Sequence, residues 1–124
     1  MDMSGLSSSS ASVSSLSPKQ VQAVRRGLQE KQMFLLLAET FQALGDSSRI
    51  QIVWALSQGE LSVGHLTELV GMSQPAVSHH LRTLRNLKLV RVRKSGRTSF
   101  YSLDDEHIEN LLKEGMSHVR DFLR

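Results

Sequence analysis

The sequence predicts a mainly α-helical fold with one small β-hairpin, and three observations support this fold class. Apolar residues recur at every third or fourth position over most of residues 17–87, a spacing typical of amphipathic helices. Val90 and Val92 then alternate with arginines up to a Ser95-Gly96 turn, and residues 98–103 form the returning strand. Helical spacing resumes from about Asp105 to the C-terminus. Helices followed by a hairpin in this order predict a winged helix-turn-helix.

Composition separates a tail from one modest domain. Residues 1–16 are dominated by serine and cannot bury enough apolar surface to offset the entropy of ordering, so we expect a disordered tail. Residues 17–124 are expected to form a single domain with room for one small core. Cysteine is absent, which excludes thiolate metal sites and disulfides. The longest apolar run is too short to span a bilayer, so we expect a cytoplasmic protein without membrane contact.

The first helical region has a clear start and a clear end. Ser17, Pro18 and Gln20 form an N-cap, a proline in the first turn and a capping-box partner. The apolar pattern then continues from Val21 until Gly45. This region can be two helices or one bent helix.

The next two helices are expected before the turn at residues 71–73. Asp46 or Ser47 caps the first, which ends at Gly59, and residues 61–70 form the second. The buried face of the first is expected to consist of four apolar residues. These are Ile50, Val53, Trp54 and Leu56.

The helix expected at residues 74–87 fits the reading helix of a helix-turn-helix, which enters the major groove. Its inward stripe is Val77, Leu81 and Leu84, and its other side is polar. No acid occurs between Glu68 and Asp104, whereas seven lysines and arginines do, a charge distribution suited to phosphate. Polar residues on this helix can read bases, and the hairpin can add contacts to the DNA backbone. The candidate DNA-binding residues are Ser73, Gln74, Ser78, His79, Arg82, Arg93, Lys94 and Arg97.

The last helix carries Asp105, His107, His118 and Asp121, which are residue types that bind zinc or cobalt. The two histidines are 11 residues apart, so they lie on one helix face. They are also separated by about 16 Å along the axis, too far to share one metal. Two copies of this helix, paired antiparallel in a homodimer, would form two sites of two nitrogens and two carboxylates. A simple capping or surface role for these residues remains open.

Three segments resemble the ArsR/SmtB repressors: residues 43–50, residues 73–84 and residues 96–101. The resemblance covers about residues 34–124 and implies a homodimeric winged-helix repressor of metal efflux or sequestration genes. SmtB-like and CzrA-like sensors of this family place interfacial ligands on the last helix, which implies that Asp105, His107, His118 and Asp121 bind metal. Asp121 departs from the Glu or His usual at the fourth position, and the cysteines of the family's other site have no counterpart. The missing cysteines make arsenic sensing unlikely. Nickel sensors of the family use extra N-terminal ligands, whereas the first histidine here is His65, so zinc or cobalt is favoured over nickel.

Two other functions fit part of the pattern. A winged-helix regulator could bind DNA without metal and use its last helix for dimerisation alone. A zinc hydrolase could use the His and Asp residues, but all four ligand positions would be filled by protein and no general base lies nearby. We therefore expect a metal-responsive repressor that binds operator DNA, with no enzymatic activity and no small-molecule substrate.

Overall fold

The computed structural model describes residues 15–124. Residues 1–14 lie outside it, so the disorder expected for the serine-rich tail stays a prediction. The chain divides into two compact units, one ending at Leu37 and one starting at Ala38. No helix of the described part is long and apolar enough to cross a membrane.

The first unit begins with helix α2 (Pro18–Gly27), whose start follows the predicted capping box. The Ser17 hydroxyl accepts the Gln20 N–H at 3.2 Å, and the Gln20 side chain accepts the Ser17 N–H at 2.8 Å. Helix α3 (Lys31–Leu44) follows after a short break and extends into the second unit. Of the two alternatives left open by the sequence, separate helices are the one that occurs.

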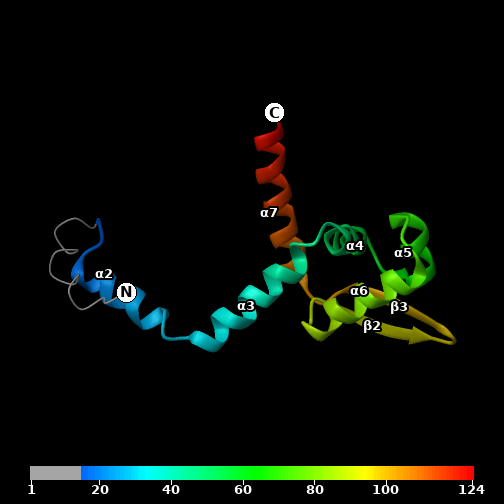
Figure 1. Ribbon diagram of the computed structural model, residues 1–124, viewed down its shortest axis with the longest axis horizontal. Helices are drawn as coiled ribbons and strands as arrows, with labels where there is room; N and C mark the ends of the chain where they lie inside the picture. The colour runs from blue at the N-terminus through cyan, green and yellow to red at the C-terminus, as the bar shows by residue number, and fades with distance from the viewer. Residues whose placement is uncertain (1–14) are drawn as a thin grey trace. The chain divides into compact units, whose positions relative to one another are not determined.

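The second unit combines helices with a small antiparallel sheet, which lies along one edge of the unit (Figure 1). Its helices are α4 (Ser47–Ser57), α5 (Val63–Val70), α6 (Gln74–Asn86) and α7 (Glu106–Leu123). The strands β1 (Leu61–Ser62), β2 (Val90–Ser95) and β3 (Thr98–Leu103) lie in the order β1-β3-β2. This is the helix-turn-helix followed by a hairpin that the sequence predicts. The core consists of Ala43, Leu44, Ile52, Val53, Ala55, Leu56, Leu66, Val77, Leu81, Leu84, Leu89 and Val90.

Helix α4 buries a different face from the predicted one. Val53 and Leu56 are buried as expected, but Ile50 and Trp54 remain 36% and 46% exposed. Ile52 and Ala55 are buried in addition. Apolar residues surround most of this helix, so periodicity could not identify the side that meets the core.

The predicted helix over residues 61–70 is wrong in its first two residues. Leu61 and Ser62 form β1, which pairs with Tyr101 and Phe100 of β3. The helix proper starts at Val63, because the Ser62 hydroxyl accepts the His65 N–H at 3.2 Å and caps it. A two-residue strand is too short to show a sequence period, so only its pairing partner reveals it.

The turn into α6 and the hairpin loop both use glycine in a left-handed conformation. Gly71 ends α5 at φ 69°, and Gly96 stands in the loop between β2 and β3 at φ 62°. Residues with a Cβ rarely adopt this region, so the two glycines favour these tight turns. The hairpin pairs Val90 through Ser95 with Leu103 through Thr98, without a break in register.

Candidate DNA-binding face and metal ligands

Helix α6 presents its candidate contacts on the side away from the core. Its inward residues Val77, Leu81 and Leu84 are fully buried, as predicted. The opposite side carries the exposed Gln74, His79 and Arg82, together with the half-buried Ser78. The Ser73 hydroxyl accepts the Ala76 N–H at 3.3 Å and caps the helix. The structure therefore positions a polar helix face whose first turn is free for contact.

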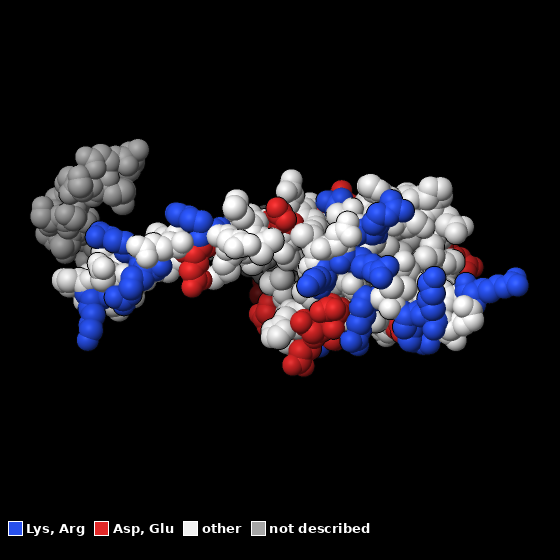
Figure 2. Space-filling view, turned by 90° about the horizontal axis from the view of Figure 1, so that it is seen from below, with Lys and Arg blue, Asp and Glu red and all other residues white. Residues whose placement is uncertain are grey.

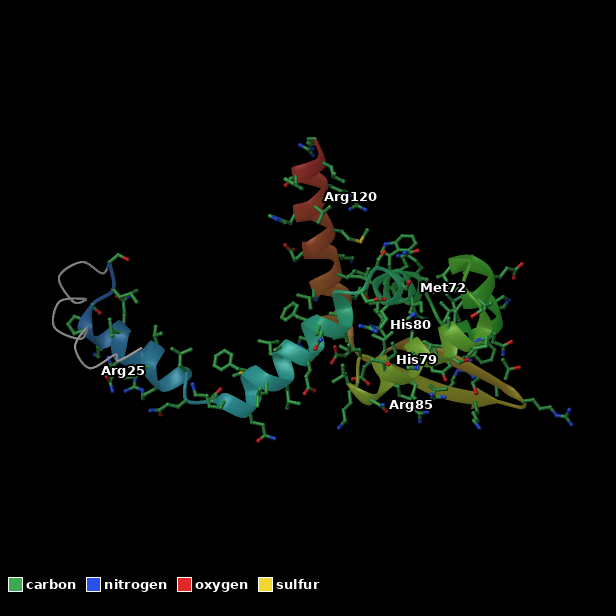
Figure 3. All side chains as sticks on the ribbon, in the orientation of Figure 1. Arg25, Met72, His79, His80, Arg85 and Arg120 are labelled. Atoms are coloured by element: carbon green, nitrogen blue, oxygen red, sulfur yellow. The ribbon has the colours of Figure 1, made fainter. Side chains whose placement is uncertain are left out.

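The two adjacent histidines of α6 have different surroundings (Figure 3). His80 is half-buried, and its Nδ1 has no hydrogen-bond partner among the described residues. His79 is exposed, with its ring centroid 6.0 Å from that of His80. His79 is therefore the more accessible of the two to a partner outside the protein.

The hairpin carries most of the remaining candidate contacts. Lys94 and Arg97 are exposed at its tip, on either side of Ser95 and Gly96. Figure 2 shows lysine and arginine side chains spread over the side of the second unit that bears α6 and the hairpin. A positively charged surface of this kind is suited to a phosphate backbone.

Arg93 differs from the other hairpin bases because its guanidinium already has a partner. Its Nε lies 3.0 and 3.1 Å from the two carboxylate oxygens of Glu60, and its Nη2 lies 2.7 Å from Oε1. The same guanidinium is 4.9 Å from the centre of the Phe100 ring. Hydrogen bonding to Glu60 raises the pKa of Arg93 above its already high usual value. No local pattern in the sequence indicates this pair, because the two residues are 33 positions apart.

The predicted metal ligands occupy the two ends of α7. Asp105 caps the helix by accepting the His107 N–H at 2.9 Å, and its Oδ1 lies 3.3 Å from the Nδ1 of His107. Partial burial raises the pKa of the Asp105 carboxyl, but hydrogen bonds from the His107 side chain and backbone outweigh it and lower the pKa. Near the other end, Asp121 lies 3.7 Å from the guanidinium of Arg124, and His118 is exposed.

The structure brings Asp105 and His107 together, and it keeps His118 and Asp121 at the far end of the same helix. Within residues 15–124 no three His, Asp or Glu side chains are close enough to hold one metal ion. Each end of α7 supplies one imidazole and one carboxylate, which is half of a tetrahedral zinc ligand set. The donor chemistry fits zinc if a second chain supplies the other half.

An open apolar groove of about 1230 Å³ lies beside α7 in the second unit. Exposed apolar side chains of α4 and α7 line it, including Trp54, Leu111, Val119 and Leu123. Phe122, on the same helix, is 81% exposed. Exposed apolar surface on this scale is typical of a protein interface.

Comparison with known proteins places the chain in a family. Residues 46–92 match the model of the bacterial regulatory proteins of the arsR family. The chain is 41% identical over 103 residues to the transcriptional repressor SmtB homolog of Synechocystis, an alignment that covers 83% of this chain and 76% of that protein. The chain belongs to the ArsR family. This confirms the resemblance found in the sequence.

Two further relatives of this ArsR-family chain are regulators. It is 40% identical over 92 residues to the cadmium resistance transcriptional regulatory protein CadC homolog of Staphylococcus aureus, covering 73% of this chain and 76% of that protein. It is 46% identical over 77 residues to the HTH-type transcriptional regulator KmtR of Mycobacterium tuberculosis. The latter alignment covers 62% of this chain but only 59% of KmtR.

Solved structures confirm the winged helix-turn-helix fold. The solution structure of apo-NmtR is similar with a TM-score of 0.64 and 44% identity, over 74% of this chain and 77% of that one. The homodimeric winged helix-turn-helix domain of Mb0332 from Mycobacterium bovis has a TM-score of 0.72 and 25% identity, over 77% and 88% of the two chains.

Proposed function

We propose that this protein is a metal-responsive transcriptional repressor. Its metal-free homodimer binds operator DNA in the cytoplasm, and zinc or cobalt bound between the subunits releases the DNA. Genes for metal efflux or sequestration would then be expressed. The observation that carries the proposal is the split ligand set on α7, with Asp105 and His107 at one end and His118 and Asp121 at the other, in a chain of the ArsR family.

DNA recognition is assigned to α6 and the hairpin. The exposed side of α6 would enter the major groove, with Gln74 and Ser78 at base edges and Arg82 at a base or a phosphate. Ser73 and His79 flank this set, and Lys94 and Arg97 at the hairpin tip would contact the backbone. The exposed side chains of the first turn of α6 and of the hairpin tip support this assignment.

Dimerisation through α7 is assigned to its exposed apolar side. At about 100° per residue, His107, Leu111 and His118 lie within about 40° of one another on the helix surface. The two candidate histidine ligands therefore lie next to the apolar surface that lines the groove beside α7. A second chain that covers this surface with an antiparallel α7 brings its own His118 and Asp121 next to Asp105 and His107. The homodimeric Mb0332 domain supports a dimer of this fold.

Metal would act through the geometry of the dimer. Ligands from two subunits would connect the ends of the two α7 helices. The dimer releases operator DNA if its two α6 helices then no longer match the spacing of successive major grooves. Because the coupling is reciprocal, operator DNA must weaken zinc binding by the same factor. The name of the cadmium resistance regulator supports a metal effector, and the two imidazoles and two carboxylates of each site support zinc.

Zinc titration of the operator-bound dimer tests the proposal. Wild-type protein should leave the operator as zinc is added, with two zinc ions bound per dimer, one for each proposed site. His118→Ala should still fold, dimerise and bind the operator, because the change lies outside α6 and the hairpin, but zinc should no longer release it. Operator binding with no zinc binding by calorimetry in the wild type would instead support a regulator that works without metal.

A further inference from the structure

The pair formed by Arg93 and Glu60 joins the two outer strands of the sheet. Arg93 lies on β2, and Glu60 directly precedes β1. Strand β3 runs between them and contributes Phe100, which is the register partner of both Arg93 and Ser62. The arginine side chain therefore passes over the ring of Phe100 and reaches the carboxylate at the opposite edge of the sheet.

The ion pair engages two of the three guanidinium nitrogens of Arg93, Nε and Nη2. Three nitrogen-to-oxygen distances of 2.7 to 3.1 Å to Glu60 form a two-point contact that arginine makes and lysine does not. One face of the guanidinium also lies over an aromatic ring, which favours the cation. Arg91, which lies on the same side of β2, makes only a 3.4 Å hydrogen bond to Ser102.

The hairpin needs an attachment of this kind. Beyond its base, β2 is exposed, and the tip with Lys94 and Arg97 extends away from the core. Strand β1 has only two residues, so few backbone hydrogen bonds hold β3 to the helical body. A side-chain link across the sheet restricts the angle at which the hairpin leaves the domain, and thereby positions the tip.

We propose that Arg93 is a positioning residue and does not contact DNA phosphate. Its ion pair with Glu60 across Phe100, called the clasp below, holds the hairpin against the rest of the domain. The proposal rests on the proposed DNA-binding function, and it changes the role of Arg93, which the sequence places among the candidate DNA contacts. Glu60 thereby contributes to DNA binding, although it is an acid near a surface that attracts a polyanion.

The sign of the effect of Glu60→Ala on operator affinity separates the two roles of Arg93. If Arg93 is a positioning residue, Glu60→Ala loosens the hairpin and lowers affinity by about 1.5-fold to fivefold, as expected for loss of one partly exposed ion pair. If Arg93 contacts phosphate, removing Glu60 frees the guanidinium and removes a negative charge, so affinity rises. Glu68→Ala, which removes an exposed acid of α5, is the charge control and should not lower affinity.

Two Arg93 variants sharpen the test. Arg93→Ala should also lower affinity, and the double variant should bind no more weakly than Arg93→Ala, because both break the same ion pair. Arg93→Lys should restore little affinity, since lysine cannot make the two-point contact, whereas it would restore most of a phosphate contact. Increased operator affinity in Glu60→Ala, or wild-type operator affinity in Arg93→Lys, would overturn the proposal.

Hydrogen exchange of the DNA-free protein tests the clasp separately from DNA binding. Glu60→Ala should speed amide exchange in β2 and β3 and leave α6 unchanged. Wild-type protein that fails to bind any operator would contradict the proposed function, but the exchange comparison would still decide the clasp. Unchanged exchange in the hairpin would refute it.

Discussion

Asp46 and Arg49, at the junction of α3 and α4, each hydrogen-bond a backbone group at a helix end. The Asp46 carboxylate accepts the Arg49 N–H at 2.9 Å and caps α4. The Arg49 guanidinium donates to the carbonyl of Ala43 at 2.7 Å and thereby satisfies the end of α3. Gly45 lies between α3 and α4, where an added Cβ would stand in tight contact, 3.1 Å from the Phe41 carbonyl oxygen. The spacing of this Asp and Arg therefore serves local helix capping.

The capping hydrogen bond predicts a pH effect at Asp46. The hydrogen bond from the Arg49 backbone is the main cause that lowers the pKa of Asp46 below its usual 3.8. A lowered pKa in the folded state means that the ionised carboxylate adds stability above the usual value, and that this stability is lost as the pH falls below it. Asp46→Asn keeps a capping oxygen but has no charge. Thermal unfolding should therefore show the variant less stable near neutral pH and equal to wild type in acid. A constant difference at every pH would contradict this.

Gln74 is the residue we expect to read one base. Its side chain is exposed in the first turn of α6, where it can reach a base edge in the major groove. Gln74→Ala should cost about 1 to 3 kcal/mol of operator binding at one base position if the contact is bidentate. Binding to operators substituted one position at a time measures this. Equal losses on operator and random DNA would reject the assignment.

At the scale of elements, α6 and the hairpin both belong to the proposed DNA-binding surface but are held differently. Helix α6 is anchored by three fully buried residues, Val77, Leu81 and Leu84. The hairpin is held at its base by the buried Val90, and its tip is exposed. We therefore expect sequence selectivity from the helix and mainly electrostatic affinity from the hairpin tip.

Arg97 tests the contribution of the hairpin tip. Arg97→Ala should weaken binding to all DNA sequences to a similar extent, because phosphate contacts carry no sequence information. It should also lower the slope of log affinity against log salt by about 0.9 for each phosphate that is no longer neutralised. Titrations of operator and random DNA at several salt concentrations measure both effects. A loss confined to the operator would show that Arg97 reads bases.

At the scale of the whole molecule, one chain holds only halves of the proposed metal sites. The exposed apolar side of α7 and the two proposed ligand pairs at its ends would be complementary to a second copy that packs antiparallel. If the site is shared, sensing and dimerisation depend on the same helix, and any change at the interface affects both.

A heterodimer of one His107→Ala subunit and one His118→Ala subunit tests the shared site. Both missing ligands fall in the same site, whereas the other site receives wild-type His107 and His118 from opposite chains. The heterodimer should therefore bind one zinc ion tightly, while each single-variant homodimer binds none tightly. Calorimetry on the purified heterodimer measures the stoichiometry. No tight zinc binding by a folded heterodimer would overturn the interfacial site.

The sequence by itself determined the elements whose signal is local. The buried stripe Val77, Leu81 and Leu84 follows from helical periodicity, and the hairpin follows from alternation around a turn. The capping box of α2 follows from Ser17 and Gln20, which are three residues apart. Each of these patterns lies within a few residues of chain. The four candidate metal ligands come from residue type and spacing together with the family resemblance, and both their role and the shared site stay predictions.

Tertiary structure alone decided the features that depend on distant partners. β1 exists because Leu61 and Ser62 meet β3, about 40 residues later in the chain. The exposure of Trp54 depends on which side of α4 meets the core, and apolar residues on several sides of that helix left the choice open. The partner of Arg93 is a carboxylate 33 residues away that only the fold brings within 2.7 Å. Contacts of this kind have no sequence period, because folding and not chain spacing sets the distance between the partners.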